Sequence, residues 1–190
     1  MRPASTIREQ KSKLRTRMRG ILALMPAALR RQKSLGIVMK IQRSAAYRKA
    51  HSVLVYIPLP REVDVRPLIK AALREGKSVY APRLVSGGVR LEVFRIQSFE
   101  HDLKRGSYGI LEPRPLRNRL GRAEDMELIL APGLAFDGRG GRLGRGLGCF
   151  DRFLKKASGA LIFGVAFREQ KCRRVPIESH DIKVNRVFTD

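Results

Sequence analysis

The chain has 190 residues, 43% of them hydrophobic, so it is long enough to enclose a core and does not have the composition of a disordered protein. Its 40 Lys and Arg against 17 Asp and Glu give a formal net charge of +23. Residues 1–50 hold 14 of these cations and a single acid, Glu9. The positive electrostatic field of such a chain favours binding of polyanions, such as nucleotide phosphates, polyglutamate or RNA. The charge alone does not indicate which of these is the ligand.

The same composition argues against several other classes. No apolar run approaches the roughly 20 residues that span a bilayer, so we expect neither a transmembrane segment nor a membrane partner. Cys149 and Cys172 show no Cys-x-x-Cys or Cys/His spacing, which argues against a zinc site. They are typical of reduced thiols in a cytoplasmic protein.

Two helices are expected at the N-terminus. Thr6 and Glu9 have the spacing of a capping box, and apolar residues then recur at helical intervals to Met25. Pro26 suits the first turn of a second helix, which we expect to continue to about Tyr47.

After this pair, apolar runs alternate with helical patterns. We expect strands at 52–57, 78–81, 91–96, 128–131 and 160–165, with a turn at Gly87-Gly88 before the third of them. We expect helices at 65–75, with Asp64 as its cap and Gly76 as its end, and from about residue 151. Residues 112–125 are expected to form an irregular connection. This alternation predicts an α/β fold with a mainly parallel sheet flanked by helices and an N-terminal helical pair. The chain contains no internal repeat or long linker, so residues 1–190 are predicted to form a single domain.

Residues 132–151 are the most informative segment. Between an expected strand and an expected helix, six glycines at positions 138–148 are interleaved with Arg139, Arg142 and Arg145. Glycine lets backbone N–H groups approach an anion, a helix N-terminus favours negative charge, and arginine offers phosphate a forked donor. The pattern indicates a phosphate-binding loop that is neither a Walker A loop nor a dinucleotide fingerprint. From composition alone, a flexible surface loop or an RNA-binding Arg-Gly-Gly tract remains an alternative.

Four further segments carry candidate functional residues. Lys11 and Arg15 share one helix face, which read alone is also consistent with a solvated basic surface. Glu62 follows the first strand at its carboxyl end, where α/β sheets place their sites, and it has no capping role to explain it. Residues 108–113 are expected to form a turn. Asp181, after Ser179-His180, is either a metal ligand or an ordinary loop residue.

In their order and spacing these segments resemble the 5-formyltetrahydrofolate cyclo-ligase family, also called methenyltetrahydrofolate synthetases. The matching segments are Lys11-Ser12-Lys13-Leu14-Arg15, Glu62-Val63-Asp64, Gly109-Ile110-Leu111-Glu112-Pro113, Pro132 to Asp137, Arg142 to Leu154, Gly164-Val165-Ala166-Phe167 and His180-Asp181. The match runs from about residue 8 to the end, so the basic N-terminus is expected to belong to the domain. Cys149-Phe150 departs from the family pattern, which has two aromatic residues before the aspartate.

The resemblance implies ATP- and Mg²⁺-dependent conversion of 5-formyltetrahydrofolate, with or without a polyglutamate tail, to 5,10-methenyltetrahydrofolate. It implies catalytic roles for Arg145 and Glu62 and a magnesium site at Asp151 and Asp181. The residues implied to bind ATP are Lys11, Ser12, Lys13, Leu14, Arg15, Arg142, Leu143, Gly144, Arg145, Gly146, Leu147, Gly148, Cys149 and Phe150. Those implied to bind folate are Ile57, Glu62, Arg145, Gly146, Leu147, Gly148 and Cys149.

We expect a cytoplasmic monomer that binds nucleic acid only nonspecifically, if at all. Two alternatives stay open at this stage. One is a basic RNA-binding protein that uses the Arg-Gly loop, although only 6% of its residues are aromatic and Trp is absent. The other is a family member that binds folate or nucleotide with weak or no turnover, because of the Cys149 departure.

Overall fold

The computed structural model describes residues 5–85, 87, 90–106 and 110–190. Helix α1 (Ile7–Leu24) begins with the predicted capping box: Thr6 Oγ1 accepts a hydrogen bond from Glu9 N at 3.2 Å, and Glu9 Oε2 accepts one from Thr6 N at 3.1 Å. Helix α2 (Ala27–Arg43) follows Pro26, which confirms the N-terminal helical pair.

The second helix is shorter than predicted. It ends at Arg43, and a separate helix α3 (Ala45–Lys49) follows after Ser44, so the expectation of one helix to Tyr47 was wrong. The Ser44 hydroxyl donates to Ile41 O at 2.6 Å and accepts from Tyr47 N at 3.3 Å. The Ser44 side chain therefore ends α2 and caps α3. The spacing of apolar residues, on which the prediction depended, does not reveal such a break.

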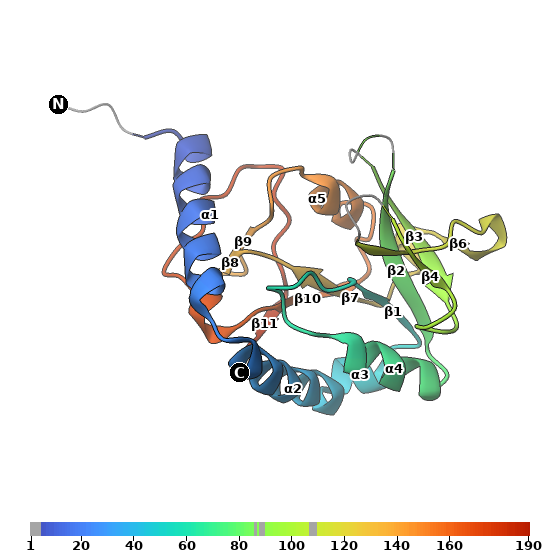
Figure 1. Ribbon diagram of the computed structural model, residues 1–190. Coiled ribbons are helices and arrows are strands. Elements are labelled where there is room, and N and C mark those ends of the chain that lie inside the picture. Colours follow the sequence, from blue (N-terminus) through green and yellow to red (C-terminus); the bar gives the residue numbers. More distant parts are fainter. Residues whose placement is uncertain (1–4, 86, 88–89, 107–109) are drawn as a thin grey trace.

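Within the described residues, seven strands form the central sheet in the order β11-β10-β7-β1-β2-β3-β6 (Figure 1). Their bounds are β1 (Ser52–Val55), β2 (Ser78–Val85), β3 (Arg90–Ile96), β6 (Leu120–Gly121), β7 (Leu128–Pro132), β10 (Leu161–Val165) and β11 (Arg186–Phe188). Neighbours from β11 to β2 are parallel, and β3 and β6 add antiparallel pairs. The predicted α/β fold with a mainly parallel sheet is confirmed.

Several short elements differ from the sequence-based expectation. The segment 112–125 is not wholly irregular, because β5 (Leu111–Pro113) pairs with β4 (Leu103–Arg105) and β6 pairs with β3. Short 3₁₀ helices lie at η2 (Arg117–Arg119), η3 (Ala123–Asp125) and η4 (Arg168–Gln170). Of the expected turns, Gly88, Tyr108 and Gly109 lie outside the described residues.

Helices cover both faces of the sheet, and β1 shows how its residues divide between them. Val53 and Val55 belong to a core cluster shared with α1, α2 and α4 (Arg66–Arg74). Leu54 points to the opposite face, into a cluster that includes Phe153 of α5 (Cys149–Leu154). Apolar residues at successive positions are the mark of a strand buried on both faces.

Helix α4 begins one residue later than predicted, with Val65 at its N-cap position. The Asp64 carboxylate still accepts a hydrogen bond from Arg66 N at 3.1 Å, so it stabilises the start of the helix from one position further out. Among the described residues, no helix combines the length and the apolar character needed to cross a bilayer.

Candidate functional site

The candidate site lies at the carboxyl ends of the parallel strands. The segment after β1 carries Glu62, and the segment after β7 forms the glycine loop. Helix α1 and the segment before β11 approach the same edge, bringing Lys11 and Asp181 together. The sheet thus gathers four stretches that are far apart in the sequence, as expected for α/β proteins.

A buried carboxylate shapes the start of the glycine loop. After β7, the short strands β8 (Ala135–Phe136) and β9 (Arg142–Leu143) form an antiparallel pair. Between them, Asp137, which is 5% exposed, accepts hydrogen bonds from the backbone N–H groups of Arg139 (2.9 Å), Gly141 (2.8 Å) and Val175 (2.8 Å). Burial alone would raise the pKa of the Asp137 carboxyl, but these hydrogen bonds hold it below its usual value.

Two glycines of the loop are required by the backbone. Gly140 has φ +80°, and a Cβ there would lie 2.4 Å from Val184 O. Gly148, the residue before α5, has φ +63°. Side chains would be strained at both positions, so glycine here sets the path of the loop.

An ion pair joins the segment after β1 to the glycine loop. Arg145 donates to Glu62 Oε1 from Nε at 3.1 Å and from Nη2 at 2.7 Å. The Glu62 side chain is 13% exposed and its other oxygen accepts from Leu59 N at 3.0 Å, whereas the Arg145 side chain is 47% exposed. A partly buried carboxylate therefore orients an arginine whose remaining surface faces solvent.

Helix α1 places two cations against the site. Arg15 Nε donates to Gly144 O at 3.0 Å, which ties the helix to the glycine loop. Lys11, whose side chain is 9% exposed, donates to Asp181 Oδ2 at 2.5 Å and to Glu178 Oε2 at 2.6 Å. Part of the basic face of α1 is therefore packed against the rest of the protein and is not exposed to solvent.

The cluster of Lys11, Glu178 and Asp181 is electrostatically coupled. Burial alone would lower the pKa of Lys11, but its hydrogen bonds to the two carboxylates raise it above the usual value. Burial opposes ionisation of Asp181 as well, yet Lys11 and Glu178 N lower the pKa of that carboxyl. One ligand atom each of Glu178, His180 and Asp181 lie within 4.8 Å of one another, a grouping able to hold a cation.

Asp151 is held by a buried arginine. Arg142, 5% exposed, donates from Nη2 to Asp151 Oδ1 at 2.7 Å, and the same oxygen accepts from Ile182 N at 3.2 Å. Ile182 follows Asp181 directly in the chain. This hydrogen bond therefore places the Asp151 carboxylate next to the backbone that carries Asp181, the other predicted metal ligand. The Arg142 side chain is committed to Asp151 and to Pro132 O, so it is oriented inward.

The remaining predicted loop residues are divided between the interior and the surface. Leu143 and Cys149 are 1% and 6% exposed, whereas Leu147 is 64% exposed. Arg142 lies over the Phe150 ring at 5.5 Å, and the Gly146 backbone lies beside the Arg15 guanidinium. Cys149 Sγ lies 3.6 Å from Leu147 O, inside the turn that opens α5.

The other predicted residues are placed less directly. Ser12 and Lys13 are exposed on the outer side of α1, and the structure does not bring them to Glu62 or Arg145. Leu14 and Ile57 are partly buried and pack against the main core, which accounts for them without a ligand.

Sequence reasoning missed two residues of the site. Asp137 was noted only as part of a motif, although an aspartate directly before a Gly-Arg-Gly-Gly turn is a signal for a carboxylate that accepts backbone N–H groups. Glu178 was not singled out. Its only signal is an acid three residues before Asp181, and its contact with Lys11 spans 167 residues.

Fold and site together define an α/β enzyme with a glycine- and arginine-rich site at the carboxyl ends of its parallel strands. The family model that describes the 5-formyltetrahydrofolate cyclo-ligase family matches residues 7–190. The chain belongs to this family, so it is an enzyme of the cyclo-ligase class.

Individual relatives agree with this assignment. The chain is 29% identical to a mouse 5-formyltetrahydrofolate cyclo-ligase, over 97% of this chain and 96% of the relative. It is 31% identical to the Escherichia coli (strain K12) protein of that name, over 74% and 78%. The NMR structure of Aquifex aeolicus 5,10-methenyltetrahydrofolate synthetase superposes with a TM-score of 0.83 at 31% identity, covering 94% of this chain and 88% of that one. A Mycoplasma pneumoniae 5,10-methenyltetrahydrofolate synthetase, at 16% identity and a TM-score of 0.76, shares the fold.

Proposed function

We propose that this protein converts 5-formyltetrahydrofolate to 5,10-methenyltetrahydrofolate with ATP and Mg²⁺. The observation that carries the proposal is the Glu62–Arg145 ion pair, because it joins the segment expected to hold folate to the loop expected to hold phosphate. The names of the relatives support the folate substrate, and the cations near the glycine loop support a phosphorylated co-substrate.

The chemistry accounts for a site rich in cations and hydrogen-bond donors. The formyl oxygen attacks the γ-phosphorus of ATP, and ADP leaves. N10 of the folate then attacks the activated formyl carbon and releases its proton to solvent, which closes the five-membered ring. The bond between that carbon and the phosphate oxygen breaks, and inorganic phosphate leaves. Phosphoryl transfer depends mainly on positioning and charge neutralisation, which side chains and backbone amides supply without covalent participation.

Each residue has a defined task in this proposal. Arg145 binds the transferred phosphoryl group with the part of its guanidinium that faces away from Glu62. Glu62 orients Arg145 and accepts a hydrogen bond from the folate. Arg15 neutralises charge on the triphosphate from its position beside the Gly144 carbonyl, and Lys11 holds the Asp181 carboxylate in place.

The residues around Asp151 and Asp181 fit a magnesium ion. Within the described chain, Asp151 Oδ2 and Asp181 Oδ1 form no hydrogen bond, and hard carboxylate oxygens are the ligands magnesium prefers. When bound there, Mg²⁺ would neutralise phosphate charge. Arg142 and Ile182 N keep the Asp151 carboxylate in place for that role.

The deciding experiment incubates the purified protein with 5-formyltetrahydrofolate, ATP and Mg²⁺ and follows the methenyl chromophore. Product that requires ATP and Mg²⁺ is expected. Folate binding without product would support instead a binding-only family member, which the Cys149 departure keeps as the second candidate.

Two variants test the assigned roles. Arg145→Ala should lower kcat/KM for ATP by about 5- to 150-fold, the loss of about 1–3 kcal/mol from a forked cationic donor. Asp181→Asn should raise the Mg²⁺ concentration that gives half-maximal turnover, while Asp125→Asn, an exposed aspartate outside the site, should not. Unchanged ATP kinetics in Arg145→Ala would remove that residue from the site.

A further inference from the structure

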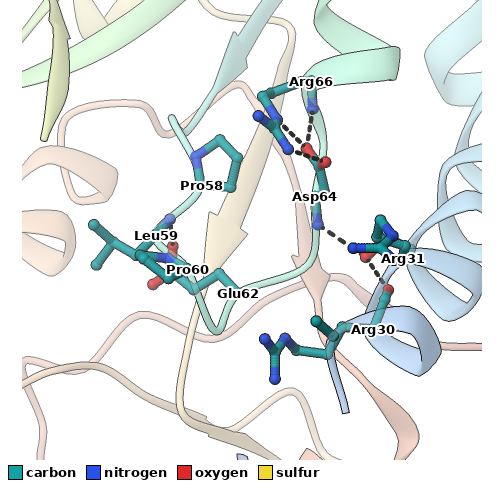
Figure 2. A pocket seen from close by; sticks show the side chains of 10 residues that line it. Arg30, Arg31, Pro58, Leu59, Pro60, Glu62, Asp64 and Arg66 are labelled. Atoms are coloured by element: carbon teal, nitrogen blue, oxygen red, sulfur yellow. Dashed lines mark hydrogen bonds and ion pairs between the residues drawn. The ribbon is translucent and has the colours of Figure 1, made fainter. Parts of the chain in front are cut away.

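Helix α2 borders a cavity at each of its ends. The first, of about 330 Å³, lies beside the candidate site, between α2 and the segment 57–66, and Glu62 and Asp64 are among its lining residues (Figure 2). The second, of about 490 Å³, lies between the last turn of α2 and β11, an edge strand of the central sheet, and is called here the β11 cavity. Arg31 lines the first cavity and Arg43 the second, twelve residues later, which is about 18 Å along a helix. The β11 cavity is therefore separate from the candidate site.

Three cations line the β11 cavity, and two of them are held in place by uncharged groups. Lys40 Nζ donates a hydrogen bond to Thr189 O at 2.8 Å. The Arg186 guanidinium lies over the Phe188 ring, 4.8 Å from its centroid. Arg43 is exposed, and its side chain forms no hydrogen bond or ion pair with any residue that the structure describes. None of these contacts neutralises a positive charge.

Acidic side chains do not balance these cations. Within the described lining there is no Asp or Glu, and its other members are Ser44, Val187, Phe188 and Thr189. The next residue along the chain, Asp190, is already paired with Lys33 at 2.9 Å. The cavity in Figure 2, by contrast, is lined by arginines and carboxylates together. Because like charges gathered around one cavity repel each other, a bound anion would stabilise the fold at this edge of the sheet.

The lining offers a ligand charge more than apolar surface. Phe188 is 5% exposed, and the Ser44 hydroxyl is already occupied by its bonds with Ile41 O and Tyr47 N. A ring or an apolar side chain would find little to pack against, whereas a compact anion is attracted by all three cations. Guanidinium groups match the geometry of phosphate oxygens, and an ammonium group adds a point charge. The volume is within the range of small-molecule sites and larger than a single phosphate ion needs.

We infer that the β11 cavity is a second anion site, which binds a small ligand with two or more linked phosphate groups. Linked phosphates concentrate more negative charge in a small volume than the carboxylates of a peptide do. The inference does not depend on the proposed function, because the cavity lies outside the candidate site and takes part in no step of the proposed reaction.

The test titrates pyrophosphate into isotope-labelled protein and follows backbone amide signals by NMR. The signals of Ser44 and Thr189 report the β11 cavity, and the signal of Gly146 reports the glycine loop. Citrate, inorganic phosphate and a homopolymer RNA are titrated in the same way. These probes separate linked phosphates from carboxylates, from a single phosphate and from a nucleic acid chain.

Two variants each remove one cation from the cavity, Arg43→Gln and Arg186→Gln. Arg48→Gln is the matched control, because Arg48 is an exposed arginine of α3 that does not line the cavity. All three positions are exposed, so the variants should fold, which circular dichroism checks. In wild type, the Ser44 and Thr189 signals should shift and saturate with pyrophosphate. Arg43→Gln and Arg186→Gln should each raise the Kd read from these signals about three- to tenfold, the range for a partly solvated charge-assisted contact, and Arg48→Gln should leave it unchanged.

Several outcomes would overturn the inference. Cavity signals that do not move show that pyrophosphate does not bind there, and equal losses in Arg43→Gln and Arg48→Gln would reflect only the overall field. Equal affinity for citrate would mean general anion binding, and equal affinity for inorganic phosphate would mean that linked groups are not recognised. An RNA that shifts these signals at a lower phosphate concentration than pyrophosphate does would assign the cavity to a nucleic acid chain.

The Gly146 signal separates this inference from the proposed function. If it responds to pyrophosphate while the cavity signals stay still, the glycine loop binds phosphate and the second site alone is overturned. If the cavity signals respond as expected and the wild type forms no methenyl product, the proposed reaction fails and the second site stands.

Discussion

Replacing Asp137 with alanine should lower the free energy of unfolding by about 2–6 kcal/mol. The carboxylate accepts three backbone N–H groups, and its bonds with Gly141 and Val175 are buried. Each buried N–H left without an acceptor costs about 1–3 kcal/mol, while Arg139 N lies closer to water and adds little. Asp137→Asn retains one acceptor oxygen and should lose roughly half as much.

Urea unfolding followed by circular dichroism would measure these losses, with Asp125→Asn as a control expected within about 0.5 kcal/mol of wild type. Because the folded pKa of Asp137 is depressed, its contribution is present above the usual carboxyl pKa and is lost as the pH falls through the folded value. The gap between wild type and Asp137→Asn should therefore narrow below about pH 4. The reasoning is refuted if Asp137→Ala is as stable as the control, or if the amides of Gly141 and Val175 keep their hydrogen-exchange protection in it.

Three further predictions concern other parts of the molecule. In Lys11→Met, the midpoint of acid unfolding should move to higher pH, because the ammonium group that lowers the pKa of Asp181 has been removed. Fluorescence or circular dichroism measures this midpoint, and an unshifted midpoint would contradict the coupling. Cys149→Tyr should destabilise the protein by about 1–3 kcal/mol in urea, because the cysteine is 6% exposed and a ring overfills its place; unchanged stability would mean that the ring turns outward. Binding to a homopolymer RNA should fall steeply as salt rises and show no sequence preference, and tight selective binding at physiological salt would instead favour an RNA-binding role.

Much of the fold was predictable because its signals are local. The capping box at Thr6, the apolar runs of β1, β7 and β10, and the glycine stop after α4 each depend on a few neighbouring residues. Strand β11 (Arg186–Phe188) went unpredicted, because a three-residue strand exists only through its pairing with β10. The β8–β9 pair inside the glycine loop was missed for the same reason.

The sequence predicted which residues belong to the candidate site better than it predicted how those residues contact one another. The resemblance supplied Glu62, Arg145, Asp151 and Asp181, but no local pattern indicates that Arg145 contacts Glu62 across 83 residues. Nor could a sequence show that Arg142 faces inward to hold Asp151. Such contacts depend on how the sheet orders its strands, which is a property of the whole chain.

The contact between α1 and the segment before β11 has a consequence for biosynthesis. Helix α1 is translated before the carboxylates that hold Lys11, which follow 167 and 170 residues later. Closing a loop of that length carries an entropic penalty that only the assembled sheet offsets. In a nascent chain, helix α1 therefore stays without these partners until Glu178 and Asp181 have been translated. A polypeptide that ends before residue 178 lacks both carboxylates, so its Lys11 has neither of the two partners described here.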